Sequence, residues 1–289
     1  MKRLILIDFS WLYNKYYYVA SYVVSQNTDN SDLTSVFLRM LTQFLLLVEK
    51  SYMDARILMA LDPSTSSLKN KGIFEGYKQQ RNKEEKKEVY SYLPHIVKSL
   101  CETLNSKSFS FIKAKHYEAD QLIAHTVKKF HDDYEIIIYS GDKDLLQLTS
   151  YSNTFVADKF EKGHFLIKTD EEIFQKFKNS KGEDFSRIST NKRDILKYRS
   201  LKGDPSDNLS SVFPRIKDKE IAEIIQNHWV DDQEEPLTEE RIDKIIEDDL
   251  QFENPSLAEK LRNNKDAWLR NYKIMDLLHV DDMDIRRLK

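Results

Sequence analysis

Three short apolar runs in this chain are each followed almost at once by an aspartate. The runs and their acids are residues 4–7 with Asp8, 57–61 with Asp62, and 134–139 with Asp142. Continuous apolar runs of this length are typical of parallel strands that are buried on both faces. Because open α/β sheets bind ligands outside the carboxyl ends of their strands, we expect the three acids to share one edge of a sheet.

Further acids accompany this group. Glu118 and Asp120 open a stretch in which apolar residues recur with helical spacing, and Asp144 follows Asp142. Two carboxylates about 4 Å apart repel by roughly 4 kcal/mol at an effective dielectric near 20, so a cluster of them needs a cation. Oxygen ligands alone suit Mg²⁺ or Mn²⁺. The pattern therefore predicts a divalent-metal site.

The rest of the pattern predicts alternating helices and strands. Helices are expected at 33–50 and 89–104, a strand at 109–112, a β-hairpin at 154–168, and mainly helices from about 170 onward. This alternation indicates an α/β fold with a parallel sheet and right-handed crossovers.

An aromatic tract runs from Trp11 to Tyr18. Three consecutive tyrosines cannot share one face of a helix, so at least one is expected to be exposed. Base stacking is one role for such a tract, and packing of the rings is the favoured one.

Residues 68–87 form a basic segment with seven basic and three acidic side chains, a net charge of +4. Phe74 and Tyr77 lie among the cations. Cations with interleaved aromatic rings are the footprint of single-stranded nucleic acid, because phosphates pair with the cations and bases stack on the rings. A solvated charged loop has the same composition, and composition alone favours it.

A second basic segment, residues 187–202, carries six cations against the single acid Asp194. It leads into Asp204 and Asp207, which stand three residues apart beside Gly203. In isolation this pair predicts a turn in which an aspartate side chain accepts a backbone hydrogen bond.

Composition sets the outer limits for a chain of 289 residues. With 40% hydrophobic and 32% charged residues it is typical of a soluble globular protein, and its net charge of -3 predicts no particular partner. Cys101 is the only cysteine, which excludes a disulfide framework and a thiolate metal site, and its apolar neighbours predict that it is buried. The first apolar run is too short for a signal peptide and no run reaches transmembrane length, so we expect a cytoplasmic protein without a membrane partner.

Six short motifs, in order along the chain, resemble the structure-specific 5′ nuclease family. This family includes flap endonucleases, the 5′-nuclease domain of bacterial DNA polymerase I and phage-type ribonuclease H. The motifs are Ile7-Asp8, Leu61-Asp62, Tyr77-Lys78-x-x-Arg81, Tyr117-Glu118-Ala119-Asp120, Gly141-Asp142-x-Asp144-x-x-Gln147-Leu148 and Lys202-Gly203-Asp204-x-x-Asp207-Asn208. Residues 271–277 resemble the closing helix of the family, so the resemblance spans nearly the whole chain. The phage ribonuclease H branch is the most similar.

The resemblance implies a PIN-like parallel-sheet nuclease domain at 1–180, with a helical arch at about 68–87. A helical DNA-binding region with a divergent helix–three-turn–helix would follow at 181–289. Two Mg²⁺ ions, for which Mn²⁺ can substitute, would be held directly or through water. The implied metal ligands are Asp8, Asp62, Glu118, Asp120, Asp142, Asp144, Asp204 and Asp207.

The resemblance also assigns roles to basic and aromatic residues. Lys78 and Arg81 would neutralise charge that develops on the phosphoryl oxygens, and Tyr77 would stack on the terminal base. Further nucleic-acid contacts are expected at Lys69, Lys71, Lys83, Lys202, Lys217 and Lys219.

Two positions depart from the family pattern. Gln121 stands where the family usually has an aspartate, and it can offer a carbonyl oxygen to a metal or a water but no charge, so weaker binding of one metal is expected. Residues 209–216 contain no glycine, although the family has a glycine-rich turn there that approaches duplex phosphates. Duplex contacts are therefore expected to shift to Lys217, Lys219 and the cations of 187–202.

The expected function is that of a magnesium-dependent 5′-3′ exonuclease and flap endonuclease with ribonuclease H activity. Its substrates would be 5′ flaps or single-stranded 5′ ends of DNA and RNA–DNA hybrids, and its role primer removal in phage-type DNA replication. A replication clamp or a single-strand-binding protein is the expected protein partner. The rival hypotheses are a branched-DNA binding module with weakened catalysis and a PIN-type ribonuclease.

Overall fold

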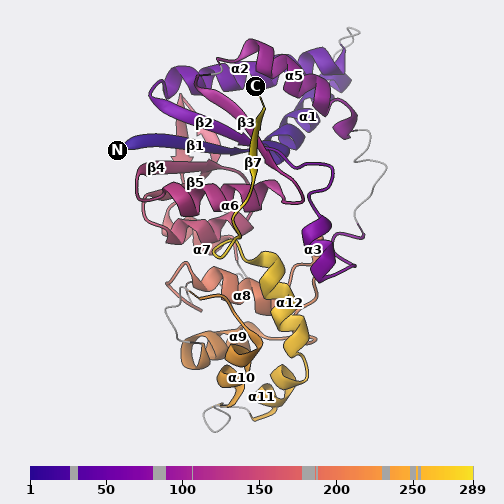
Figure 1. Ribbon diagram of the computed structural model, residues 1–289, viewed down its shortest axis with the longest axis vertical. Helices are drawn as coiled ribbons and strands as arrows, with labels where there is room; N and C mark the ends of the chain where they lie inside the picture. Colours follow the sequence, from indigo (N-terminus) through magenta and orange to yellow (C-terminus); the bar gives the residue numbers. More distant parts are fainter. Residues whose placement is uncertain are drawn as a thin grey trace.

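The computed structural model describes residues 1–26, 32–80, 89–105, 107–177, 186, 188–229, 235–247, 252 and 255–288. Its centre is a seven-stranded sheet with the strand order β6-β5-β4-β1-β2-β3-β7 (Figure 1). The strands are β1 Lys2–Asp8, β2 Ala55–Ala60, β3 Phe109–Ala114, β4 Tyr134–Tyr139, β5 Thr154–Glu161, β6 His164–Ile167 and β7 Ile285–Leu288. The predicted α/β class is confirmed.

Strand β1 lies in the middle of the sheet and is parallel to both of its neighbours. Ile5 is paired with Ile57 of β2 and with Ile137 of β4. Strands β3 and β5 continue the parallel arrangement, whereas β6 and β7 are antiparallel edges. The carboxyl ends of β1, β2 and β4 therefore meet at one edge, as the three strand-end aspartates require.

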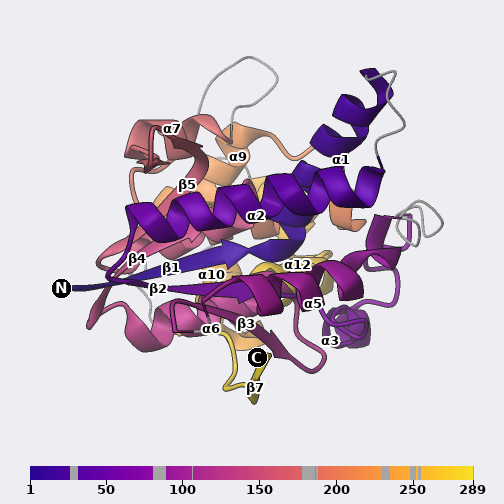
Figure 2. The ribbon, with the colours of Figure 1, turned by 90° about the horizontal axis from the view of Figure 1, so that it is seen from above.

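The two faces of the sheet are covered by different helices (Figures 1 and 2). Ile5 and Ile7 belong to the core under α1 Phe9–Gln26, α2 Leu33–Ser51 and α5 Leu93–Thr103. Leu4 and Leu6 belong to the opposite core, under α6 Ala119–Phe130. Successive strand residues point to opposite faces, so one continuous apolar run supplies both cores.

The helices after residue 180 pack below the sheet in Figure 1. Those of the described part are α8 Asp194–Lys202, α9 Asp218–Glu223, α10 Glu239–Glu247, α11 Pro255–Arg262 and α12 Lys265–Met275. Their buried residues, Trp268 among them, form one hydrophobic cluster with the α6 face of the sheet. The division at residue 180 stays a prediction, and the apolar core continues across it.

One expectation was wrong at the margin of the fold. The region after about residue 170 is mainly helical as predicted, and it ends in strand β7, which pairs with β3 and satisfies the backbone groups of an otherwise open edge. Cys101 is half-buried rather than buried, because it lies at the rim of the core beside Leu288. The aromatic tract follows the prediction, since Tyr17 is buried and Tyr18 is 53% exposed.

The remaining helices are short. Helix α3 Leu68–Ile73 opens the basic segment, and α7 Asp170–Gln175 follows the hairpin of β5 and β6. Much of the predicted arch, residues 81–88, lies outside the described residues. No helix in the described part of the chain is both long and apolar enough to span a membrane.

Gly203 ends α8 with φ +77°, and a Cβ there would stand 2.5 Å from the backbone carbonyl carbon of Ser210. We therefore expect Gly203→Ala to lower the free energy of unfolding by about 2 kcal/mol or more. The matched control is Gly72→Ala in α3, where a Cβ meets nothing within 4 Å. Urea unfolding of both variants checks the prediction, and equal losses would contradict it.

Candidate active site

The side chain of Asp8 is fixed at the end of β1. One carboxylate oxygen accepts the backbone N–H of Trp11 at 3.0 Å, and the other accepts the hydroxyl of Ser140 at 2.8 Å. Ser140 follows β4, so this contact ties together the ends of two neighbouring strands. Asp8 is only 6% exposed, so both contacts are shielded from solvent.

The start of α6 brings the second group of acids to this edge. Asp62, just after β2, accepts the backbone N–H of Ala119 at 2.7 Å, where the positive end of the helix dipole favours a carboxylate. Glu118 is the N-cap of α6 and is 7% exposed. Gln121 completes a capping box, because its side-chain oxygen accepts the backbone N–H of Glu118 at 3.1 Å.

This cap changes the interpretation of Gln121. Its amide oxygen could offer a contact to a metal or a water, and here it stabilises the first turn of α6. The weaker binding of one metal that was expected from Gln121 stays a prediction. Its contribution to the site is indirect, through the backbone of Glu118.

Asp142 and Asp144 occupy the turn after β4. The backbone N–H of Asp142 donates to Ser140 Oγ at 3.0 Å, and the backbone N–H of Asp144 donates to Asp142 at 2.9 Å. A Cβ on Gly141 would stand 2.6 Å from Trp11 Nε1, so only glycine lets this turn pack against the indole. The charge of Asp142 acts on Asp8, whereas Asp144 contacts Arg199.

The last two acids lie on a turn of the helical region. Asp204 and Leu209 exchange two backbone hydrogen bonds, and the Asp204 side chain accepts the backbone N–H of Ser206 at 2.8 Å, which is the predicted aspartate turn. Asn208 adopts the left-handed conformation that such turns favour. Its side chain donates to the carbonyl of Gly76 at 2.8 Å, which joins the turn to the basic segment.

Two cations connect the sheet acids with the turn acids. Lys78 Nζ lies 2.7 Å from Glu118 Oε1 and 3.7 Å from Asp207 Oδ2. Arg199 contacts Asp144 Oδ1 at 2.7 Å and Asp204 Oδ2 at 2.5 Å. Arg199 was expected only among the cations for duplex contact, and no sequence pattern set it apart from its basic neighbours.

Burial and mutual repulsion shift the pKa values of the acids. Burial, with added repulsion from Asp62 and Asp142, raises the pKa of Asp8 to about 7. Burial also raises the pKa of Asp144 to about 7, against the opposing effect of Arg199. The pKa of Asp120 rises well above its usual value through burial and the charge of Glu118.

At Lys78 and at Asp204 the neighbouring opposite charges outweigh the effect of burial on the pKa. Burial lowers the pKa of Lys78, but the charges of Glu118 and Asp207 outweigh it, so the pKa rises overall. Burial raises the pKa of Asp204, and the guanidinium of Arg199 more than offsets this, so the pKa falls. The cluster thus favours added positive charge or protons.

Repulsion links all eight predicted metal ligands into one network. The pKa of Asp8 is raised by the charges of Asp62 and Asp142, and that of Asp120 by the charges of Glu118 and Asp62. The pKa of Asp144 is raised by the charges of Asp204 and Asp207. Within the described residues, no three acidic, histidine or cysteine side chains already surround a common point as ligands would. The carboxylates turn instead toward Lys78, Arg199 and backbone donors. An all-oxygen donor set with unmet negative charge fits Mg²⁺ or Mn²⁺.

Tyr77 does not stand where a base could stack on it. Its ring is 2% exposed, and its hydroxyl donates to Glu118 Oε2 at 2.6 Å. Asn70 donates to the same oxygen at 3.2 Å, a contact that the sequence did not indicate. The predicted stacking role of Tyr77 is therefore wrong, and the residue helps to orient Glu118.

The predicted nucleic-acid contacts are spread over several surfaces. Lys69 pairs with Asp281 at 2.5 Å and Lys202 with Asp218 at 2.7 Å, whereas Lys71, Lys217 and Lys219 are exposed. Arg81 and Lys83 lie outside the described residues. Lys78 lies in a turn with φ 54° rather than in a helix.

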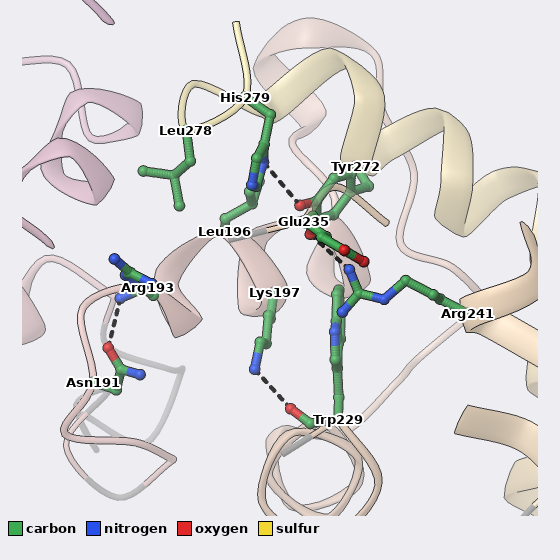
Figure 3. Close-up of a pocket in the computed structure, with 10 residues that line it drawn as sticks. All are labelled: Asn191, Arg193, Leu196, Lys197, Trp229, Glu235, Arg241, Tyr272, Leu278 and His279. Atoms are coloured by element: carbon green, nitrogen blue, oxygen red, sulfur yellow. Dashed lines mark hydrogen bonds between the residues drawn. The ribbon is translucent and has the colours of Figure 1, made fainter. Parts of the chain in front are cut away.

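A small cavity in the helical region lies apart from the carboxylate cluster (Figure 3). Its volume is about 30 Å³, enough for one or two waters. Lys197 donates to the carbonyl of Trp229 at 2.6 Å, and Arg241 to that of Glu235 at 2.6 Å, so these lining cations already have internal partners. The carboxylate cluster, rather than this cavity, is therefore the candidate active site.

Comparison with known proteins agrees with this geometry. Residues 3–178 match the family model of the 5′-3′ exonuclease N-terminal resolvase-like domain. The chain belongs to the 5′-3′ exonuclease family. It is therefore a nuclease with the PIN-like resolvase fold.

Relatives of this nuclease cover nearly its whole length. A 5′-3′ exonuclease of Mycoplasmopsis pulmonis is 25% identical over 96% of this chain and 80% of its own. DNA polymerase I of Bacillus subtilis is 23% identical over 96% of this chain but only 28% of its own, so this nuclease corresponds to part of that protein.

Solved structures of the flap endonuclease of bacteriophage T5 share the fold. One, crystallised with metal ions, has a TM-score of 0.61 and 17% identity over 95% of this chain and 89% of its own. Another, a complex with DNA and metal ions, has a TM-score of 0.60 and 18% identity over the same shares.

The raised pKa of Asp8 predicts an inverse pH dependence of stability without metal. The folded protein keeps a proton that the unfolded chain releases near pH 4, so this contribution to the free energy of unfolding is lost as the pH rises to about 7. Asp8→Asn should therefore stabilise the protein in EDTA at pH 8, by about 2 kcal/mol.

Thermal unfolding between pH 5 and pH 8 measures this gain. The control is Asp158→Asn, because pairing with Lys168 lowers the pKa of Asp158 below its usual value despite burial. That variant should lose stability at pH 8. A loss in Asp8→Asn as well would show that Asp8 is not repelled in the folded state.

Proposed function

We propose that this nuclease uses divalent metal ions, Mg²⁺ with Mn²⁺ as a substitute, to hydrolyse DNA phosphodiesters at 5′ ends or 5′ flaps. The observation that carries the proposal is the network of eight carboxylates at the strand-end edge. Six of these acids lie at the ends of β1, β2 and β4 and at the start of α6, and the other two lie on the turn at 204–207.

The eight acids would hold two ions directly or through water. One part of the network contains Asp8, Asp62 and Asp142, and the other part contains Asp144, Asp204 and Asp207. When bound, such ions lower the pKa of water and stabilise a leaving oxygen.

The residues of the chain itself supply positioning and charge. Tyr77 and Asn70 hold one oxygen of Glu118, and Lys78 holds the other. The side chain of Lys78 is 17% exposed, and its ammonium lies between Glu118 of the sheet side and Asp207 of the turn. When substrate binds, the ammonium would contact a phosphoryl oxygen in place of one of its carboxylate partners. A fixed cation at that position stabilises the charge that develops in the transition state.

The substrate proposal extends to flaps, single-stranded 5′ ends and RNA–DNA hybrids, with primer removal in phage-type replication as the role. Support comes from relatives named 5′-3′ exonuclease and DNA polymerase I and from a flap endonuclease neighbour crystallised with DNA. The proposal also includes Arg81 as a second catalytic cation. It further includes a clamp or single-strand-binding protein as partner and a cytoplasmic location.

The weakened-catalysis alternative rests on Gln121, which caps α6 and brings no negative charge to the site. The deciding experiment incubates the protein with a labelled 5′-flap duplex, an RNA–DNA hybrid and free single-stranded RNA, with Mg²⁺ or EDTA. We expect Mg²⁺-dependent cleavage of the first two. Binding without cleavage would indicate a binding module, and cleavage of free RNA alone a ribonuclease.

Asp142→Asn removes one charge from the centre of the carboxylate network. We expect it to abolish cleavage of the flap substrate while leaving the affinity for DNA, measured in EDTA, largely unchanged. Undiminished cleavage by this variant would refute the assignment of the site.

Lys78→Ala should lower the single-turnover rate about 100-fold or more and change DNA affinity much less, because a charge that acts on the transition state is removed. The matched control is Lys71→Ala, an exposed lysine on α3. Its expected effect is on affinity alone, with a shallower salt dependence. If Lys78→Ala behaves like the control, Lys78 is only a phosphate anchor.

A further inference from the structure

Arg199 lies between two acids that belong to different parts of the molecule. Asp144 follows β4 of the sheet, whereas Asp204 begins the turn after α8. Arg199 Nε donates to Asp144 Oδ1 at 2.9 Å, and Nη2 donates to Asp204 Oδ2 at 2.5 Å. The Arg199 side chain is 14% exposed and the side chain of each partner is 17% exposed, so solvent screens these contacts little.

The two acids repel each other across this arginine, since the charge of Asp204 is one of those that act on Asp144. A planar guanidinium suits such a position, because its fork of donors reaches two carboxylates at once and its charge is permanent. Lys78 makes the corresponding connection between Glu118 and Asp207. Lys78 also has backbone support, because its N–H donates to the carbonyl of Asp207.

We propose that Arg199 is a positioning residue that holds the Asp204–Asp207 turn against the sheet before metal binds, and that a divalent ion shared by Asp144 and Asp204 takes over this connection. The inference rests on the proposed metal-dependent function. Arg199 supplies one positive charge in a fixed geometry, whereas the ion would supply two positive charges. The acids of both parts are therefore already placed when an ion arrives, and binding need not order the turn.

The experiment compares Arg199→Met with wild type by thermal unfolding in EDTA and across a Mg²⁺ titration. In EDTA the variant should unfold about 5 °C lower, and saturating Mg²⁺ should restore most of that loss. The Mg²⁺-induced rise in Tm is thus expected to be clearly larger in the variant than in wild type.

The matched control is Lys197→Met. Lys197 lies on the same helix, is 13% exposed and pairs with Asp194 at 2.9 Å, away from the sheet acids. Its loss of Tm should be the same in EDTA and in Mg²⁺. If Arg199→Met also loses the same amount under both conditions, Arg199 is an ordinary buried ion pair and the inference is overturned.

Amide hydrogen exchange gives a local reading of the same proposal. The backbone N–H groups of Asp204 and Leu209 bond across the turn. In Arg199→Met they should lose protection in EDTA and regain it in Mg²⁺, whereas Lys197→Met should leave them protected. Unchanged protection in Arg199→Met would count against the proposal.

Arg199→Lys covers the case in which the methionine variant does not fold. A lysine keeps the charge but reaches only one carboxylate well, so an intermediate Mg²⁺-induced rise is expected. If Mg²⁺ raises Tm by the same amount in wild type and in the variants, and flap cleavage is intact, only the proposed role of Arg199 is overturned. No Mg²⁺ shift in any of these proteins, together with no cleavage, would overturn the metal site itself.

Discussion

Repulsion among eight carboxylates is the constraint to which the rest of this structure responds. The fold brings the ends of three parallel strands together, and each delivers an acid to the same edge. Burial deepens the repulsion, as the raised pKa values of Asp8 and Asp144 show. Such a site is costly to keep ionised unless cations are supplied, by the protein or by bound metal.

The protein supplies two of its own. Lys78 and Arg199 each pair one acid of the sheet side with one acid of the 204–207 turn. The same two cations therefore reduce repulsion and join the helical region to the sheet. Stability and assembly of the site thus depend on the same few contacts, and changes to either cation are expected to affect both.

The basic segment and the turn form a second connection beside the acids. Asn208 donates to the carbonyl of Gly76, and Gln80 donates to that of Pro205 at 2.6 Å. The arginine of α12, Arg270, covers the ring of Phe74 at 4.7 Å. The base of the predicted arch is thereby fixed to the helical region.

The sequence alone predicted a parallel α/β sheet, most of the strands and helices along the chain, and the edge where the acids meet, because apolar runs and strand-end aspartates are local signals. It also indicated all eight acids through the family resemblance. Only the tertiary structure decided the partners of those acids: Arg199 rather than another cation of 187–202, Tyr77 as a buried donor to Glu118, and Gln121 as a helix cap. Side-chain direction and long-range pairing depend on packing between distant segments, which no local pattern records. The four residues of β7 show the same limit, since they form a strand only because β3 offers them an open edge.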